Sequence, residues 1–475
     1  VKGVGEGLGD KIFYLTAKTI TGTVAKEAFE LLRTRGYQAK IIQLTAKEKL
    51  CLCEEVDCNP VHCPYAKGHY DRVNDAVYNL LQKEDVFTRE VILEQAREFR
   101  VCPFEMSLDT ATWADDIIGD YNYVFDPNVY LKRFFAEGTR GDYIFLVDEA
   151  HNLVERSREM YSASIYKEDF LAAKKLLKPY QEKHDRRAER VIRHLEKCNR
   201  ILLGYKRECE NYVVYENIGT LIFALTRLAA DLDEYLQKSP DFPERREVNE
   251  FYLNLRNFMN IYELVDEHYV VYSEHEEDGR FKLKFYCVDP SLNLQERIDK
   301  GNATIFFSAT LLPIQYYKSL LSTRRDNYAV YAQTAFSEEQ RLLLFGNDVS
   351  SKYTRRGRAE YERIALYIEK TARAKQGNYM VFFPSYRMMQ EVYDVFLEGG
   401  ATDEMRPQEY FPEGAENAEI VEHPEEAEIA EHPNDAENSG NAEPRLWGMM
   451  QQTGMREAER EAFLQAFSGE ASKRR

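Results

Sequence analysis

Three short apolar runs that end in small polar residues constrain the fold of this chain more than any other feature. The runs are KIFYLTAKT (11–19), YIFLVDEAHNLVE (143–155) and ATIFFSATLLP (303–313). Each begins with a continuous apolar stretch, which is typical of a strand covered on both faces in a parallel sheet. The first run is followed by a helical pattern that ends at a glycine (21–36) and by a second strand-like run (38–46). This β-α-β order predicts an α/β fold with a parallel sheet.

Length and composition favour several packed domains away from a membrane. The chain has 475 residues, of which 44% are hydrophobic and 13% aromatic. Such a length favours about three domains. The sequence has no apolar run near the ~18 residues of a membrane span, and no secretion signal precedes the first strand. We therefore expect a cytoplasmic, monomeric protein without a membrane partner.

The net charge of −18 is concentrated in one tract, so it does not exclude a nucleic-acid partner. Residues 403–443 hold 14 acidic residues and a single basic one, Arg406. Binding to DNA depends on local basic patches rather than on the charge of the whole chain. The tract 403–445 is rich in Glu, Ala, Pro and Asn, which predicts a disordered loop. We interpret it as a solvated spacer rather than an interaction tail.

The DEAH sequence at residues 148–151 follows the apolar run 143–147 and predicts a nucleotide site. Open α/β sheets bind ligands at the carboxyl ends of their strands. There Asp148 could hold Mg²⁺, and Glu149 could orient or deprotonate the water that attacks the γ-phosphate of ATP. His151 could relay the state of the nucleotide to the neighbouring sheet edge. A bare Asp-Glu pair is usually a solvated strand end, but its position after a buried strand favours the functional interpretation.

The second strand end with polar residues is FSAT (307–310). Ser308 and Thr310 place hydroxyl groups there, and these could hydrogen-bond the DEAH carboxylates or His151. A Ser-Ala-Thr sequence alone is weak, but after a DEAH sequence in an α/β chain it supports the same site.

Five of the eight cysteines fall within 52 residues, in the spacing Cys51-x6-Cys58-x4-Cys63-x38-Cys102 with Cys53 as a fifth candidate. Clustered cysteines without a secretion signal favour a metal site over disulfides. Zinc and an iron–sulfur cluster both suit thiolate ligands. The absence of a C-x2-C pair favours the cluster. Cys198 lies on an apolar helical stripe, so we assign it and Cys209 to packing.

These motifs together resemble the XPD/DinG-like iron–sulfur helicases of superfamily 2, and more narrowly a bacterial DinG-related branch. The matching segments, in the order of the family, are LTAKT, KEKLC…CNPVHCPYAKG…CPFE, DYNYVFDP, VDEAHNL, FFSATLLP and GNYMVFFPSY. The resemblance covers nearly the whole chain apart from the acidic tract. It implies two RecA-like parallel-sheet domains, the first interrupted by a 4Fe-4S domain and a mainly helical Arch-like insertion. It also implies translocation in the 5′→3′ direction on single-stranded or forked DNA, driven by ATP and Mg²⁺, in DNA repair.

Domain boundaries follow from the motifs and the resemblance. The first RecA-like domain is expected to be discontinuous, in the order 1–47, 106–155 and 286–325. The 4Fe-4S domain takes 48–105 and the helical insertion takes 156–285, with a hairpin at 269–289. The second RecA-like domain takes 326–475, with its best strand at 378–386 and helices at 387–400 and 455–469.

The resemblance also implies site residues by position. The cluster ligands correspond to Cys51, Cys58, Cys63 and Cys102, which leaves Cys53 as a bystander. LTAKT corresponds to a segment that touches the DNA backbone, so Lys18 and Thr19 are expected to contact phosphate; an ordinary strand-to-helix turn is the alternative. FFPSY corresponds to a DNA-facing strand end, which makes Ser385 and Tyr386 candidates. The basic and aromatic run at 352–356 suits single strands but is also common at surfaces.

The chain departs from the family in its phosphate loop. No G-x-x-x-x-G-K-[ST] sequence occurs, and GVGEGLGDK (3–11) has the glycines but lacks the Gly-Lys-Ser/Thr order. In the family this stretch follows the phosphate loop, so we expect a fragment that lacks the loop and the last helicase motifs and does not hydrolyse ATP. Two other classes stay open. These are a DEAH-box nucleotide hydrolase with structural zinc and a non-catalytic DNA-binding remnant.

Overall fold

A computed structural model describes residues 1–399 except 18, 55, 57, 240, 241, 335 and 376, and beyond them residues 450, 455 and 459. The chain divides into two compact units, Val1–Tyr331 and Ala332–Arg475. The acidic tract predicted as a loop lies outside the described residues. So does the helix predicted at 455–469, apart from residues 455 and 459.

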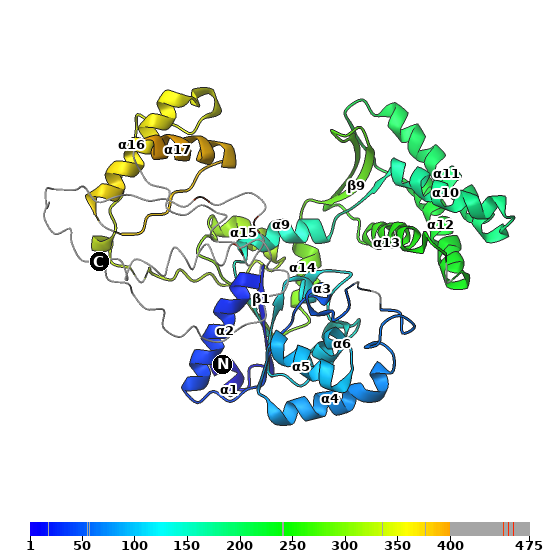
Figure 1. The fold of residues 1–475 in the computed structure, drawn as a ribbon, viewed down its shortest axis with the longest axis horizontal. Coiled ribbons are helices and arrows are strands. Elements are labelled where there is room, and N and C mark those ends of the chain that lie inside the picture. Colours follow the sequence, from blue (N-terminus) through cyan, green and yellow to red (C-terminus); the bar gives the residue numbers. More distant parts are fainter. Residues whose placement is uncertain are drawn as a thin grey trace, which may run out of the picture. The chain divides into compact units, whose positions relative to one another are not determined.

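The first unit contains a six-stranded sheet in the order β10-β5-β1-β4-β2-β3 (Figure 1). All five strand pairings are parallel. The strands are β1 (Lys11–Thr16), β2 (Ile41–Gln43), β3 (Val86–Phe87), β4 (Asp116–Asp120), β5 (Tyr143–Val147) and β10 (Ala303–Phe306). The predicted α/β class with a parallel sheet is confirmed, and each of the three apolar runs contributes one strand.

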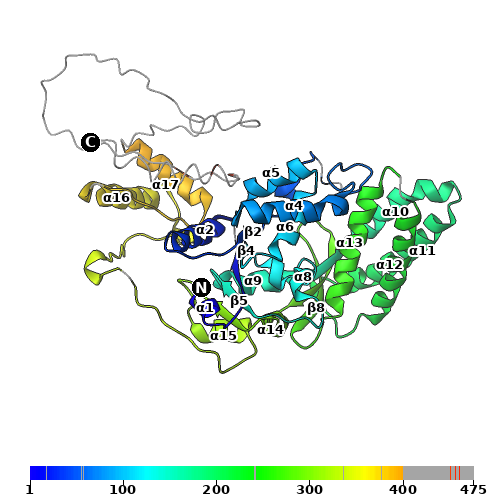
Figure 2. The same ribbon diagram turned by 90° about the horizontal axis from the view of Figure 1, so that it is seen from below.

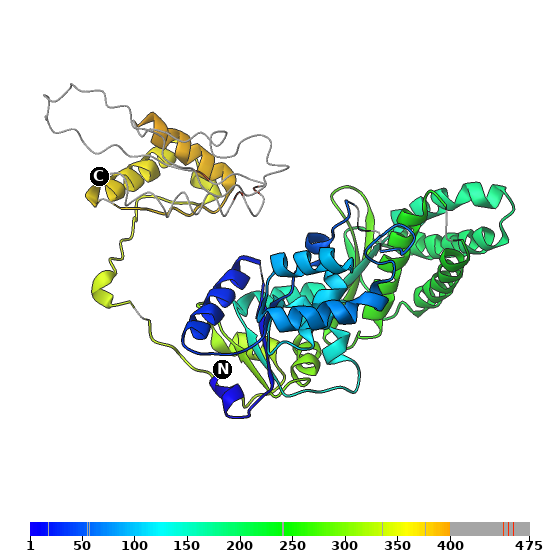
Figure 3. The same cartoon turned by 60° about the horizontal axis from the view of Figure 1, so that its bottom comes forward.

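Helices cover both faces of this sheet, which explains why its strands are apolar on both sides. Helix α2 (Thr19–Thr34) packs Ala25 and Phe29 against Ile41 and Ile118 on one face. On the other face Phe13 belongs to the main core, together with residues of α6 (Pro103–Ala111) and α8 (Lys132–Phe135). Figures 1 and 3 show α2 and the group α4–α6 on opposite sides of the strands.

The cysteine-rich insertion lies between β2 and β4 and adds the edge strand β3 to the sheet. It contains α3 (Lys47–Leu50), α4 (His69–Lys83), α5 (Arg89–Phe99) and α6, with the short strand β3 between α4 and α5. Helix α4 begins after Gly68, whose φ of 68° lies in the left-handed region that glycine adopts without strain. The turn lets the chain fold from the cysteine loop directly into the helix.

The second insertion carries a sheet as well as helices, so its predicted mainly helical character is incomplete. Its strands form an antiparallel sheet in the order β6-β9-β8-β7. The predicted hairpin is confirmed as β8 and β9, and alternate residues of β9 are buried because one face packs on the helices. The elements are β6 (Ala163–Tyr166), α10 (Lys167–Glu182), α11 (Arg186–Glu208), β7 (Tyr212–Val214), α12 (Gly219–Lys238), α13 (Arg245–Tyr262), β8 (Tyr269–His275) and β9 (Phe281–Cys287). Figure 2 shows α10 to α13 gathered beside β8.

The predicted packing role of two cysteines in this insertion agrees with their burial. Cys198 is fully buried on α11, and Cys209 follows the same helix with 5% exposure. Burial raises the pKa of the Cys198 thiol to about 12. A thiol in such surroundings stays protonated and packs as a small apolar group.

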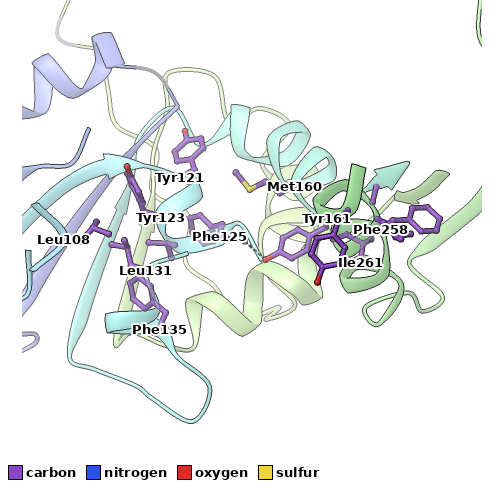
Figure 4. Packing of buried hydrophobic residues seen from close by; sticks show 14 of the residues in the cluster. Leu108, Tyr121, Tyr123, Phe125, Leu131, Phe135, Met160, Tyr161, Phe258 and Ile261 are labelled. Carbon is purple, nitrogen blue, oxygen red and sulfur yellow. Dashed lines mark hydrogen bonds between the residues drawn. The ribbon is translucent and has the colours of Figure 1, made fainter. Parts of the chain in front are cut away.

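The second insertion joins the parallel sheet through a continuous core (Figure 4). Between them the buried Tyr161 hydroxyl donates to the carbonyl of Phe125, 2.6 Å away. Phe258 of α13 stacks on Phe285 of β9 with ring centroids 4.2 Å apart. The remaining elements of the first unit are α1 (Lys2–Gly5), α7 (Asn122–Phe125), α9 (His151–Met160), α14 (Ser291–Ile298) and α15 (Ile314–Leu321).

The second unit is described mainly by helices α16 (Arg358–Ala374) and α17 (Tyr386–Glu398), with short 3₁₀ turns at Glu338–Gln340 and Tyr353–Arg355. The helix predicted at 387–400 is confirmed as α17. The strand predicted at 378–386 is wrong for the described residues, because no strand is found between 332 and 399. Phe382 is 84% exposed. A strand requires a hydrogen-bonded neighbour, and none of the described residues of this unit supplies one.

A buried carboxyl group at the amino end of β4 predicts a pH dependence of stability. Asp116 is 1% exposed, and its Oδ2 accepts a hydrogen bond of 2.8 Å from the Tyr37 hydroxyl. Its Oδ1 has no hydrogen-bond partner among the described residues. Burial, opposed by the Tyr37 hydrogen bond, raises the pKa of Asp116 from 3.8 to about 6.

Because the folded state holds this proton more tightly than the unfolded state, the contribution of Asp116 to stability is largest at low pH. It falls as the pH rises through about 6. We expect Asp116→Asn to gain about 1.4 kcal/mol relative to the parent chain between pH 5 and pH 8, which corresponds to one pKa unit. Urea unfolding at the two pH values measures this difference. The exposed Asp75→Asn is the control, and an equal gain in both variants would contradict the prediction.

Candidate nucleotide site and cysteine cavity

The DEAH and SAT sequences lie side by side at the carboxyl edge of the parallel sheet. Asp148 directly follows β5, and Ser308 follows β10, the strand that pairs with β5. Residues 17–19 follow β1 on the other side of β5. Since all these strands are parallel, their carboxyl ends meet at one edge, where this class of sheet binds ligands.

The Asp148 carboxylate is held in one orientation by two hydrogen bonds. Its Oδ1 accepts from the backbone N–H of Glu149 at 2.8 Å, and its Oδ2 accepts from the Tyr14 hydroxyl at 3.1 Å. Burial, together with the charge of Asp148, raises the pKa of Tyr14, so this hydroxyl stays a donor. Each carboxylate oxygen has further lone pairs, so Asp148 retains the capacity to bind a cation.

Glu149, His151 and Ser308 form a hydrogen-bonded group across β5 and β10. The Ser308 hydroxyl donates to Glu149 Oε2 at 2.9 Å and lies 2.8 Å from His151 Nδ1. Because its only proton goes to Glu149, the Ser308 oxygen accepts from His151, and the imidazole carries a proton on Nδ1. The hydrogen bonds that the sequence predicts for Ser308 are therefore present.

Thr310 contacts Ser308 rather than the DEAH carboxylates. Its hydroxyl lies 3.4 Å from the Ser308 hydroxyl, and its backbone N–H donates to the same oxygen at 3.2 Å. Thr310 is exposed, whereas Ser308 is half-buried. The structure thus assigns the direct link to Ser308 and gives Thr310 a supporting position.

Two tyrosines that the sequence motifs do not identify hold the DEAH turn. Tyr14 binds Asp148 as described. The hydroxyl of Tyr121, which is fully buried after β4, donates to the backbone carbonyls of Asp148 and Glu149, the latter at 3.0 Å. Glu149 has a φ of 47°, a left-handed conformation that is costly for a residue other than glycine. Tyr121 helps to hold this conformation. Tyr121 lies in the DYNYVFDP segment (120–127), which carries part of the family resemblance but gave this residue no role.

The glycine-rich segment 3–11 lies at the opposite edge of the sheet. It leads into the amino end of β1, where a Cβ on Gly9 would come within 2.8 Å of Ile144. The backbone N–H of Asp10 donates to the carbonyl of Asp142, which precedes β5. This segment therefore packs on the sheet away from Asp148, and it does not form a phosphate loop at the DEAH edge.

The structure describes only some of the residues that are predicted to contact DNA. Lys18 lies outside the described residues, and Thr19 begins α2, with its side chain outside them as well. In the second unit Ser385 caps α17 by accepting from the Met388 N–H at 3.3 Å, and Arg356 lies 3.4 Å from its hydroxyl. Tyr386 is 46% exposed. Arg356 also stacks on exposed Tyr353, so the run 352–356 and Ser385 lie together.

The five clustered cysteines line one cavity of about 270 Å³ in the first insertion. Cys53 Sγ lies 3.8 Å from Cys63 Sγ. Lys47 donates a hydrogen bond to Cys58, which raises the pKa of the lysine. Burial raises the pKa of Cys102, which is brought to the same cavity by the start of α6. The structure therefore unites all predicted ligands, and it places Cys53 among them.

The thiols of this cavity suit either zinc or an iron–sulfur cluster. Tetrahedral zinc with Zn–S bonds of about 2.3 Å holds its sulfurs about 3.8 Å apart, which is also the distance between Cys53 Sγ and Cys63 Sγ. Among the described residues no three cysteine sulfurs lie within 4.8 Å of one another. The only three metal-binding side chains that come this close there are Asp266, Glu267 and His268, outside the cavity. The donor set therefore fits both groups, and the choice between them belongs to the proposed function.

One further side chain of the cavity is absent from the sequence motifs. His69, the first residue of α4, is 3% exposed and lines the cavity. Its Nδ1 accepts a hydrogen bond of 3.2 Å from the backbone N–H of Cys102, and burial lowers its pKa. Its Nε2 is buried and has no hydrogen-bond partner among the described residues.

Comparison with known proteins finds relatives among DNA helicases. The DEAD_2 family model matches residues 20–170, which include the cysteine cavity and the DEAH turn. The ATP-dependent DNA helicase XPD of Sulfolobus acidocaldarius is 24% identical over 361 residues, covering 74% of this chain and 60% of that protein. The general transcription and DNA repair factor IIH helicase subunit XPD/RAD3 of Saccharomyces cerevisiae is 21% identical over 431 residues, covering 76% and 54%.

The chain is thus similar to XPD-type helicases of superfamily 2 over about three quarters of its length. It spans between a half and three fifths of the length of these XPD relatives. A solved structure named XPD_Helicase matches at 19% identity with a TM-score of 0.42, covering 82% of this chain and 69% of that one. Among the described helices, none combines the length and apolar character needed to cross a bilayer.

Proposed function

We propose that the chain is part of an ATP-dependent DNA helicase of the iron–sulfur XPD/DinG type that translocates 5′→3′ on single-stranded or forked DNA. The observation that carries this proposal is the hydrogen-bonded group of Glu149, His151 and Ser308 beside Asp148. In it Asp148 would hold Mg²⁺ and Glu149 would orient the attacking water. Ser308 and His151, with Thr310 behind them, would couple the nucleotide to the neighbouring strand.

The domain assignment extends this proposal. Residues 48–105 would form the 4Fe-4S domain, 156–285 the Arch-like insertion and 326–475 part of a second RecA-like domain. Support for the last comes from the order of its apolar runs and helices, since RLLLFG (341–346) precedes α16 and NYMVFF (378–383) precedes α17. Leu342 and Phe345 are 81% and 83% exposed, and such exposed apolar side chains mark surfaces that pack against another element or partner.

The DNA contacts proposed for this enzyme are Lys18 and Thr19 in the first RecA-like domain and Ser385 and Tyr386 in the second. Hydroxyl and lysine side chains at strand ends suit the phosphate backbone, and an exposed tyrosine suits base stacking. The proposal also includes membership of the bacterial DinG branch, action as a monomer and a cytoplasmic location.

Fluorescence anisotropy with labelled oligonucleotides tests the proposed DNA binding, because we expect tighter binding to single strands than to duplex. Equal affinity for both would contradict it.

We expect the 475-residue chain itself not to hydrolyse ATP at a useful rate, because it contains no G-x-x-x-x-G-K-[ST] sequence. The lysine charge and the Mg²⁺-binding hydroxyl of such a loop have no substitute in the glycines of residues 3–11. Phosphate release with and without single-stranded DNA measures this. Glu149→Gln is the control, since residual turnover from a contaminant would be the same in this variant. Robust turnover that Glu149→Gln abolishes would overturn the expectation.

A second candidate that the sequence leaves open is a non-catalytic DNA-binding remnant that retains the fold. It would bind single strands as tightly as the proposed helicase part does, but ATP would not change its affinity. A DEAH-box hydrolase with structural zinc in the cysteine cavity is the other alternative. Metal analysis of anaerobically purified protein distinguishes the zinc alternative from the iron–sulfur proposal. A cluster brings iron, sulfide and absorbance near 400 nm, whereas the zinc protein would be colourless.

A further inference from the structure

The imidazole of His69 is a buried polar group that nothing in the proposed nucleotide or DNA chemistry uses. Its ring lines the cysteine cavity, and its Nε2 has no hydrogen-bond partner among the described residues. Leaving a buried donor or acceptor unpaired costs on the order of 1–3 kcal/mol. Native proteins therefore pair such groups, if not with the chain itself then with water or with a bound group.

The position of the proton on this ring follows from its other nitrogen. Nδ1 accepts the hydrogen bond from the Cys102 N–H at 3.2 Å, so Nδ1 carries no proton. A ring with a free lone pair at Nδ1 is neutral and has its proton at Nε2. The unpaired atom is therefore an N–H donor, and a donor on a residue that lines a cavity of thiols is suited to a sulfur acceptor.

The backbone fixes this donor between two of the cysteine segments. The Lys67 N–H donates to the carbonyl of Cys63 at 3.1 Å, and the His69 N–H donates to the carbonyl of Ala66 at 3.2 Å. Cys102 immediately precedes α6 and holds the ring through its own N–H. The His69 ring is thus tied to the segments of both Cys63 and Cys102, and a T-shaped contact with Tyr70 at 5.2 Å supports it.

We propose that His69 is a positioning residue whose Nε2–H donates a hydrogen bond to a sulfur atom of the group held by the cysteines. This inference rests on the proposed iron–sulfur function. A hydrogen bond to sulfur stabilises the more negatively charged, reduced state of an iron–sulfur group and so raises its reduction potential. His69 would therefore set the potential of this group without being one of its ligands.

The test compares three variants in the full chain, loaded anaerobically with iron and sulfide. His69→Leu removes the donor, His69→Gln keeps an amide N–H near the position of Nε2, and His62→Leu is the control at an exposed histidine between Cys58 and Cys63. Iron and sulfide content is measured first, and a redox titration followed by EPR then gives the potential. We expect His69→Leu to lower the equilibrium constant for reduction about tenfold, a shift of about 59 mV for one electron. His69→Gln should recover most of this shift, and His62→Leu should match the parent chain.

The outcomes distinguish a failure of the proposed iron–sulfur function from a failure of the proposed role of His69. A parent chain that binds no iron and sulfide overturns the iron–sulfur function, whatever His69 does. Full loading with an unchanged potential in His69→Leu overturns the role of His69 and means that water pairs with Nε2. If His69→Leu does not fold, ¹⁵N-histidine NMR of the unloaded parent chain decides, because a proton found on Nδ1 of His69 would overturn the proposal and one on Nε2 would support it.

Discussion

Replacing Cys63 with Ala is expected to abolish iron and sulfide binding and the absorbance near 400 nm. Cys63 is 9% exposed, lines the cavity and lies 3.8 Å from Cys53. A cluster of this type is held by four thiolates, so the loss of a buried ligand opens it to solvent. Because the energy of metal binding contributes to folding, the insertion should also unfold at a lower temperature. Iron and sulfide analysis after anaerobic loading measures the first effect, and limited proteolysis of residues 48–105 measures the second.

Matched cysteine variants make this result specific. Cys198→Ala changes a fully buried thiol on α11 and should leave the iron content unchanged. Cys51→Ala should behave like Cys63→Ala, whereas Cys53→Ala should retain the cluster, since the family resemblance assigns the first ligand to Cys51. The contact between Cys53 and Cys63 makes the comparison of Cys51 and Cys53 informative. Full iron content in Cys63→Ala would refute the assignment of this cavity.

Replacing Phe13 with Ala is expected to lower the free energy of unfolding of the first unit by about 3–5 kcal/mol, the usual cost of removing a buried phenylalanine. Phe13 is fully buried at the middle of β1. Its ring lies 5.3 Å from Phe134 and from Tyr143, and 5.2 Å from Phe135, between ring centroids. Its removal leaves a cavity where the central strand meets its covering helix. Urea unfolding followed by circular dichroism measures the loss.

The control for Phe13 is Phe223→Ala on α12, whose side chain is 55% exposed. It contacts the Arg227 guanidinium at 4.4 Å from the ring centroid, so we expect a cost below about 1 kcal/mol. A cost for Phe13→Ala as small as that of Phe223→Ala would mean that the core around β1 repacks. It would also weaken the view that this sheet positions the DEAH turn.

Local sequence patterns predicted most of the elements but not their limits. The apolar runs became β1, β5 and β10, and the amphipathic stripe around Cys198 became the buried face of α11. In the DYNYVFDP segment, Asn122–Phe125 is a helix, α7, whose aromatic side chains belong to the main core, and no local pattern identified this helix. The strand predicted at 378–386 failed because an apolar run predicts burial, whereas a strand also needs a partner that the run cannot specify.

The residues of the candidate sites also fall into two groups, those that the sequence identifies and those that it does not. Asp148, Glu149 and the cysteines are recognisable from residue type and spacing. Tyr14, Tyr121 and His69 are not, because each is a common residue whose importance comes from one contact with a distant segment. The second insertion was predicted as mainly helical because its strands β6 and β7 are short and far apart in the chain. Their pairing with the β8–β9 hairpin cannot be predicted from the hydrophobic periodicity of any one segment.

By itself, the sequence determined the α/β class, the polar ends of the strands and the thiolate character of the first insertion. These properties depend on residue type and on the short hydrophobic periodicities of strands and helices, and both can be read from neighbouring residues in the sequence. Only the tertiary structure decided that β10 lies next to β5 and so brings Ser308 to Glu149 across 159 positions. It also brought His69 to Cys102 and both to one cavity. Pairing of parallel strands and packing of helices are non-local, so the contacts that make the site appear only when the chain is folded.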